Sequence, residues 1–285
     1  MPEREYRMLK MPYAILLEEL KLLDLQKTAT ILAKAEGIIY ADATRAVRNC
    51  CGILATDLTL QEAKTICNEL NGEGVGVFYM EQSKMYFPAS AMVVNNGDCL
   101  EDGFHAQDMY GRSYPLDWAN VILISLGRVV ERKEAVTYDG SPTRAAIRGG
   151  GIVVAALFGG ALAAPAPAGS SSRRKITEEE DFVLDIFSKE PQERHYRIKQ
   201  KGFNYDYLGA RLRPIAGENF HFLVEDLVRF ATQAYGNRGI NAFLSGKEPE
   251  KLNYSDLDHF DRENLWLLQL IHCQTPPAEE KKAQT

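Results

Sequence analysis

The sequence predicts an α+β protein, in which a small α/β domain is followed by a strand-rich domain that one helix caps. The clearest helical patterns lie before residue 73 and at 218–235, where apolar residues recur three and four positions apart. Long β-forming runs lie between them, at 104–133 and 182–208. The length of 285 residues is enough for two domains, each with a core of its own.

Residues 12–82 predict a small α/β domain. Its first strand is expected at Tyr13–Leu17, a short apolar run. Asp24 can then cap a helix that ends at Gly37, and a second helix is expected to start at Asp42. Both segments carry apolar residues at helical spacing, so each is expected to bury one face.

The third helix of this domain has the strongest local signal. Thr59 and Glu62 form a capping box, and an apolar stripe follows on one helix face until Gly72. The stripe consists of Ala63, Ile66, Cys67 and Leu70. β-forming residues on either side of this helix predict two further strands, at Gly52–Ala55 and Val75–Met80.

Four segments between Thr28 and Met80 resemble a known family: Glu36–Ile38, Ala41–Val47, Leu58–Ala63 and Gly74–Val77. They are similar to a turn, two helix starts and the closing strand of the C-terminal domain of the bacterial ribosomal stalk protein. The resemblance implies three helices on a three-stranded sheet. That family recruits translation factors through lysines and an arginine on its helices. Here those positions hold Thr30, Ala33, Ala41 and Thr44, so the resemblance carries over the fold and not factor binding.

Residues 88–245 predict a second domain, which is rich in strands. The run at Phe104–Asp108 is followed by a turn at 110–112 and a long strand at Leu116–Val130. Further strands are expected at Phe182–Phe187 and His195–Lys199, and Phe203–Leu208 is expected to continue the sheet. Alternation in the fourth of these strands predicts that Tyr196 and Ile198 face inwards, while Arg197 and Lys199 face outwards.

An amphipathic helix is expected at Glu218–Tyr235, after these strands. Strands followed by one helix predict a small barrel or a bent sheet that the helix caps. This order, with Asp117–Ile122 entering the long strand, resembles a pleckstrin-homology-like domain.

A low-complexity insertion interrupts the second domain at about 137–178. Its uncharged stretch, Gly149–Ala164, would be about 24 Å long as a helix, which is shorter than a comfortable membrane span. We expect a flexible insertion; a segment that contacts a membrane or a partner and a true span are the alternatives. The tail, 246–285, has enough apolar residues to pack partly on a domain.

Motifs for catalysis, metals and cofactors are weak in this sequence. The five cysteines have no CxxC spacing, which predicts free thiols rather than disulfides or a zinc site. The histidines form no HExxH motif, no serine lies in a GxSxG turn, and Gly149–Gly151 lacks the Gly-Lys-Ser/Thr of a phosphate loop. We therefore expect no cofactor, no metal and no catalytic residue, with an enzyme of unrecognised type as the remaining alternative.

Basic residues in and beside the predicted strands of the second domain are the candidate binding residues, because the chain is otherwise acidic, with a net charge of -6. They are Arg128, Arg132, Lys133, Arg194, Arg197, Lys199, Lys201, Arg211 and Arg213. They could bind anionic headgroups or an acidic partner, or they could protect sheet edges from aggregation. An acidic chain is not expected to bind nucleic acid.

These observations predict a non-enzymatic binding or adaptor protein with a protein partner that the sequence does not identify. The alternative is a peripheral membrane protein that binds anionic lipid through the basic strands and the Gly/Ala segment. Charged residues interrupt Met1–Leu23, so no signal peptide is expected and the predicted location is the cytoplasm.

Overall fold

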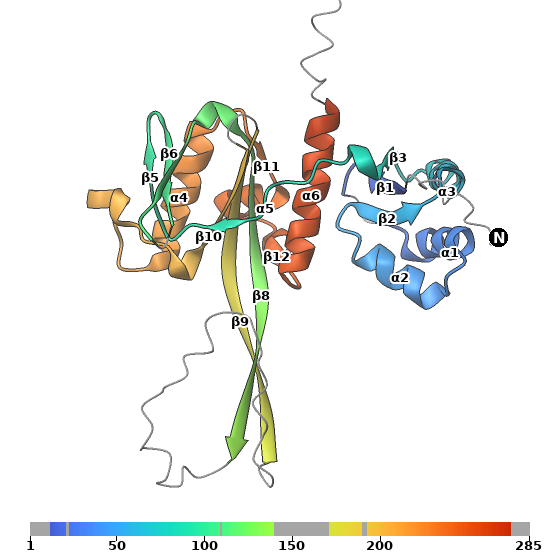
Figure 1. Ribbon diagram of the computed structural model, residues 1–285, viewed down its shortest axis with the longest axis horizontal. Coiled ribbons are helices and arrows are strands. Elements are labelled where there is room, and N and C mark those ends of the chain that lie inside the picture. Colours follow the sequence, from blue (N-terminus) through green and yellow to red (C-terminus); the bar gives the residue numbers. More distant parts are fainter. Residues whose placement is uncertain (1–11, 21–22, 109, 140–170, 190–192, 275–285) are drawn as a thin grey trace, which may run out of the picture. The chain divides into compact units, whose positions relative to one another are not determined.

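The computed structural model describes residues 12–20, 23–108, 110–139, 171–189 and 193–274 (Figure 1). The chain forms two compact units, one containing residues up to 130 and from 180 onward, the other 131–179. Helices and sheets are both present in the larger unit, which confirms the α+β class. In the smaller unit, the described residues belong to two long strands, β8 (Val121–Asp139) and β9 (Ser171–Ser188).

The first sheet is antiparallel, with strand order β2-β1-β3. Its strands are β1 (Tyr13–Leu17), β2 (Ile53–Leu58) and β3 (Val77–Glu81), and its helices are α1 (Leu25–Glu36), α2 (Tyr40–Arg48) and α3 (Leu60–Gly72). Both predicted caps are present, because Asp24 accepts from the main-chain N–H of Lys27 and Thr59 forms its capping box with Glu62. Helix α2 begins two residues before the expected Asp42.

The two faces of this first sheet are covered by different helices. Ile15 and Leu17 point into a core with the three helices, while Ala14 and Leu16 pack on the other side in a cluster that includes Trp266. Trp266 belongs to helix α6 (Leu257–Gln274). The alternation of β1 therefore places one row of side chains on α1–α3 and the other on α6.

The central sheet has strand order β11-β8-β9-β10-β4, and β12 also pairs with β8. The shorter strands are β4 (Met92–Val93), β10 (Arg194–Lys199), β11 (Tyr235–Gly236) and β12 (Asn253–Tyr254). A third sheet contains β5 (Asn96–Leu100), β6 (Gly103–Gln107) and β7 (Ser113–Leu116). In the described residues no sheet closes on itself, so the small barrel that the sequence allowed is not formed there.

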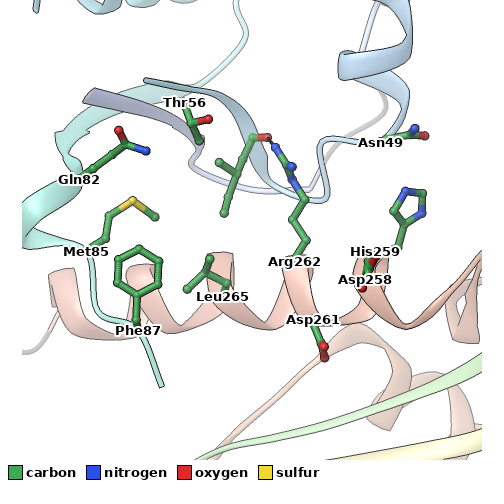
Figure 2. Close-up of a pocket in the computed structure, with 11 residues that line it drawn as sticks. Asn49, Thr56, Gln82, Met85, Phe87, Asp258, His259, Asp261, Arg262 and Leu265 are labelled. Carbon is green, nitrogen blue, oxygen red and sulfur yellow. Dashed lines mark hydrogen bonds between the residues drawn. The ribbon is translucent and has the colours of Figure 1, made fainter. Parts of the chain in front are cut away.

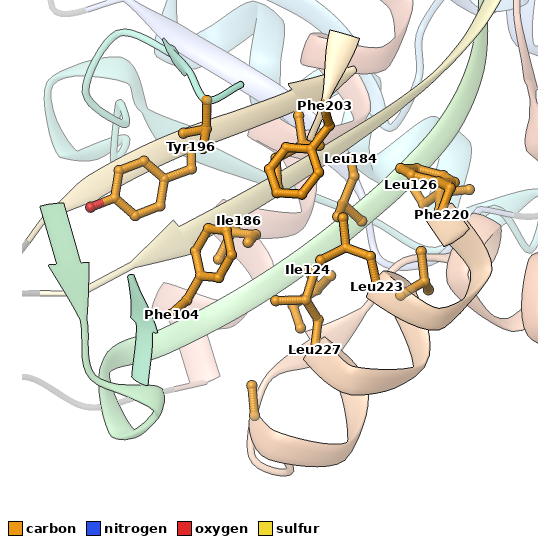
Figure 3. Packing of buried hydrophobic residues seen from close by; sticks show 14 of the residues in the cluster. Phe104, Ile124, Leu126, Leu184, Ile186, Tyr196, Phe203, Phe220, Leu223 and Leu227 are labelled. Atoms are coloured by element: carbon orange, nitrogen blue, oxygen red, sulfur yellow. The ribbon is translucent and has the colours of Figure 1, made fainter. Parts of the chain in front are cut away.

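The largest core lies on one side of the central sheet, between its strands and helices α4 (Ala216–Phe230) and α5 (Arg238–Ser245) (Figure 3). Leu184 and Ile186 of β9 and Tyr196 and Ile198 of β10 point into this core. The short 3₁₀ helices in the described residues are Gln82–Lys84, which follows β3, and Trp118–Asn120, Gln200–Gly202, Asp206–Arg211 and Pro249–Leu252.

Helix α6 covers the opposite side of the central sheet. Its Phe260 packs with Val129 and Val183, and its Leu268 packs with Leu123 and Phe187. Since α6 also contacts the first sheet, this helix lies between two sheets, as Figure 1 shows. Residues 257–274 of the predicted tail are thus a central element of the fold.

The burial of Arg197 corrects the sequence prediction for β10. Tyr196 and Ile198 face the main core as expected, but Arg197 is only 6% exposed instead of pointing into solvent. The alternation itself was right. The prediction failed because α6 covers the second face of the sheet, so the four middle residues of β10, His195–Ile198, are all buried, while Lys199 is partly exposed.

Other differences concern the ends of elements. Phe203–Leu208 forms no strand: Asn204 makes one isolated bridge to Asn96, and a 3₁₀ helix begins at Asp206. The helix expected to reach Tyr235 ends at Phe230. At the edges of the predicted insertion, residues 137–139 and 171–178 are strand. The rest of that insertion, including Gly149–Ala164, lies outside the described residues.

Candidate functional site

Four polar side chains meet beneath α6, on the face of the central sheet opposite the main core. Asp185 of β9 lies across from Arg197 of β10, which donates to both of its carboxylate oxygens, at 2.8 Å from Nε and 2.6 Å from Nη2. His195 Nε2 lies 2.8 Å from Asp185 Oδ2, and Asn264 Nδ2 donates to the same oxygen at 3.2 Å. These residues form the Asp185 network, which joins α6 to β9 and β10.

Asp261 connects the Asp185 network to the surface. Its carboxylate accepts a hydrogen bond from Arg197 Nη2, and its side chain is 45% exposed. Burial raises the pKa of Asp261 above its ordinary value, although Arg197 opposes this shift. Burial would also raise the pKa of Asp185, but hydrogen bonds from Arg197 and His195 outweigh it and hold that pKa below its usual value. The buried Asp185 carboxylate is therefore charged at neutral pH.

Two adjoining cavities lie along α6, with volumes of about 430 and 280 Å³, and together we name them the α6 cleft. Both are lined by Phe87, Asp261 and Leu265. Figure 2 shows the larger cavity, with Met85, Phe87 and Leu265 grouped at one end and Asn49, His259 and Arg262 toward the other. The smaller cavity is lined by residues 87–91 together with Phe187, His195 and Asn264. The α6 cleft thus has an apolar part next to a polar one.

Arg262 provides a fixed positive charge in the wall of the α6 cleft. Its Nε donates to the carbonyl of Cys50 at 2.9 Å and its Nη2 to the carbonyl of Ile53 at 2.7 Å. Among the residues that the structure describes, no carboxylate forms an ion pair with Arg262. Carbonyl oxygens hold the guanidinium in place without neutralising it, so this group can recognise an anionic part of a ligand.

A serine, a histidine and an aspartate near the start of α6 resemble a catalytic triad in composition only. Ser255 Oγ lies 2.5 Å from His259 Nδ1, but Asp256 accepts from the main-chain N–H of His259 rather than from its ring. That contact is a helix cap. The arrangement therefore stabilises the first turn of α6.

The predicted basic residues are spread over several surroundings in the structure. Arg197 lies beneath α6, and Arg211 is paired with the buried Asp226 of α4. Arg128 Nη1 lies 3.6 Å from Glu180, and Lys201 donates to the carbonyl of the same glutamate. The remaining residues occupy strands or stack on rings, namely Arg132 and Lys133 in β8, Arg194 over Tyr114, Lys199 in β10 and Arg213 over Phe222. Acidic side chains thus neutralise several members of the proposed patch.

The residues of the Asp185 network and the α6 cleft were absent from the sequence prediction, except for Arg197. Asp185 had a usable signal, because it is the single charge inside the apolar run Phe182–Phe187. A lone acid in a buried strand needs a basic partner, and Arg197 is the nearest basic residue on the next strand that faces the same side. Phe87 and Arg262 gave no such signal.

Burial makes four of the cysteines, Cys50, Cys51, Cys67 and Cys99, poor nucleophiles, whereas Cys273 is exposed. Burial raises the pKa of the Cys51 and Cys67 thiols to about 11 and that of Cys99 to about 12.

All five cysteines are free, and within the described ranges no three His, Cys, Asp or Glu side chains are arranged to hold a metal ion. No helix in those ranges has both the length and the apolar character needed to cross a membrane.

Comparisons with known proteins give no match. No family model, no curated protein and no solved structure matches this chain. The likenesses to the ribosomal stalk domain and to a pleckstrin-homology-like domain therefore stay predictions from the sequence.

Proposed function

We propose that this chain is a non-enzymatic adaptor protein that holds a peptide segment of a protein partner in the α6 cleft. The observation that carries the proposal is Phe87, an aromatic side chain that is 60% exposed where the two cavities adjoin. Exposed aromatic residues at the centre of a cleft are typical binding anchors, since burying them on association is strongly favourable.

The charges of the α6 cleft favour one kind of peptide. Met85, Phe87 and Leu265 can receive an apolar side chain, and Arg262 can bind a carboxylate beside it. Asp258 and Asp261 line the same cavity, and Asp261 is already paired with Arg197. The matching segment has a large apolar residue next to an acidic residue or next to its C-terminal carboxylate. The Asp185 carboxylate contacts three polar side chains and is fully buried, so it cannot reach a ligand in the cleft. This is consistent with a role in stabilising the fold rather than in catalysis.

The main chain beside Phe87 supports the same proposal. No main-chain hydrogen bond joins residues 87–90 to another described residue, and this segment leads into β4, the edge strand of the central sheet. A segment of this kind can pair with an extended peptide, which would place peptide side chains in the cleft.

The free thiols support a reducing compartment, so we place the protein in the cytoplasm as part of this proposal.

Phe87→Ala should weaken capture of the partner roughly 30-fold or more, because truncating an aromatic anchor costs about 2 kcal/mol or more of binding free energy. Immobilised wild type and variant would be compared by quantitative mass spectrometry of bound proteins. Tyr110→Ala is the matched control, since Tyr110 is a 71% exposed aromatic residue outside the cleft. Equal capture by Phe87→Ala and wild type for every bound protein would rule out the α6 cleft as the binding site.

Binding to anionic vesicles should be no stronger than binding to neutral ones, because acidic groups neutralise Arg128, Arg197 and Arg211. The measurement is co-sedimentation with phosphatidylserine or phosphatidylcholine vesicles, using the full chain and a deletion of 149–164. Salt-sensitive binding to phosphatidylserine that disappears in the deletion would instead support the peripheral membrane alternative.

A further inference from the structure

A third cavity, distinct from the α6 cleft, has a volume of about 610 Å³, which is in the range of small-molecule sites. We name it the leucine pocket, because four leucines line it. The four are Leu17, Leu20, Leu23 and Leu25. It shares no lining residue with either cavity of the α6 cleft, so the two sites can bind different ligands.

The floor of the leucine pocket is apolar and belongs to a buried core. Leu17, Val47 and Cys50 are each no more than 6% exposed and belong to the core of the first sheet or its edge. Burial and the nearby Glu263 carboxylate raise the pKa of the Cys51 thiol to about 11, so this wall carries no thiolate at neutral pH. An aliphatic chain therefore finds only uncharged surface at the floor.

The pocket also carries an excess of positive charge. Arg48, Arg238 and Lys251 come from three different elements, against one acidic lining residue, Glu263. Glu263 is engaged by Arg238 at 2.9 Å and by the hydroxyl of Tyr254. Arg48 forms no ion pair with a described residue, and Lys251 pairs only with the exposed Glu248, an interaction worth about 1 kcal/mol at most. Two cations are thus left to receive an anionic group.

The composition of the lining limits the class of ligand. No Ser, Thr, Asn, Gln, Tyr or His is among the described residues that line the leucine pocket. Sugars and nucleobases need several such groups for their hydroxyls and ring nitrogens, whereas an aliphatic chain needs none. We propose that the leucine pocket binds an aliphatic carboxylate, with its chain on the leucines and its carboxylate between Arg48 and Lys251.

The test is isothermal titration calorimetry of the full chain with sodium decanoate below its micelle concentration. We expect saturable binding of decanoate, much weaker binding of decanol and none of acetate, because both the charge and the chain are recognised. Equal binding of decanol and decanoate would overturn the role of the cations, and no saturable binding of decanoate would overturn the proposal as a whole.

Two variants locate the site. Arg48→Gln should weaken decanoate binding about tenfold, the equivalent of one charged hydrogen bond. Arg45→Gln is the matched control, because Arg45 is exposed on the same helix and does not line the pocket. Leu20→Glu, at an exposed position, should abolish binding by placing a carboxylate among the leucines. If Arg45→Gln weakens binding as much as Arg48→Gln, or if Phe87→Ala abolishes it, decanoate binds elsewhere and the assignment is wrong.

Discussion

Replacing Trp266 by alanine should lower the free energy of unfolding by about 3–5 kcal/mol, the usual cost of truncating a buried aromatic side chain. The indole of Trp266 packs directly against Gly52, where an added Cβ would lie 2.2 Å from its Cγ. It also covers Ala14 and Leu16, and its Nε1 donates to the carbonyl of Leu17 at 2.7 Å. The variant leaves a cavity between α6 and the first sheet. Urea denaturation followed by circular dichroism measures the effect.

Two further variants separate the contributions of Trp266. Trp266→Phe keeps most of the ring but leaves the buried Leu17 carbonyl without its donor, so we expect a loss of about 1–3 kcal/mol. Tyr235→Ala removes a half-exposed aromatic ring and should change stability by about 0.5 kcal/mol or less. If Trp266→Ala is no worse than Tyr235→Ala, α6 does not cover the first sheet in solution.

Asp185→Ala should destabilise the protein by about 3–5 kcal/mol, because it leaves the charge of Arg197 buried without its main partner. Asp42→Ala is the matched control. It removes an Asp–Arg pair in which both side chains are mostly exposed, and such pairs contribute about 1 kcal/mol or less. Chemical denaturation of both variants at pH 7 gives the comparison, and similar losses in the two would show that the Asp185 network contributes little.

The pH dependence of the Asp185 network follows from the lowered pKa of Asp185. A carboxyl group with a lowered pKa in the folded state stabilises the fold at every pH above its unfolded pKa, about 3.9. That contribution is lost as the pH falls through the lower, folded value. The difference in stability between wild type and Asp185→Asn should therefore persist at neutral pH and shrink only below about pH 4.

Local features of the sequence predicted much of the fold. The caps at Asp24 and Thr59 and the strand Tyr13–Leu17 depend on residues close together in the chain, and the structure has all three. The end of α4 was predicted less well. Apolar residues continue at helical spacing beyond Phe230, but Tyr235 pairs with β8 instead, a contact 112 residues away that no local pattern contains.

The candidate site could not be predicted, because it depends on where α6 lies. Arg197 and Asp261 are separated by 64 residues, and Arg262 reaches the carbonyl of Cys50 over 212 residues. Alternation in β10 places Arg197 on one face of the sheet, but it does not say that a helix covers that face. Phe87 is likewise one apolar residue among many until α6 forms one cavity beside it with the first sheet and another with the central sheet.

The position of α6 has a consequence for how the protein is made. The carbonyl of Leu17 accepts a hydrogen bond from Trp266, which is 249 residues later in the chain. At roughly 5–20 residues per second, translation needs on the order of tens of seconds to cover that separation. Until then, no helix covers Ala14, Leu16 and Ile53. Their exposed apolar surface can associate with other nascent chains. Yield in cells should therefore depend on chaperones that shield this surface during synthesis.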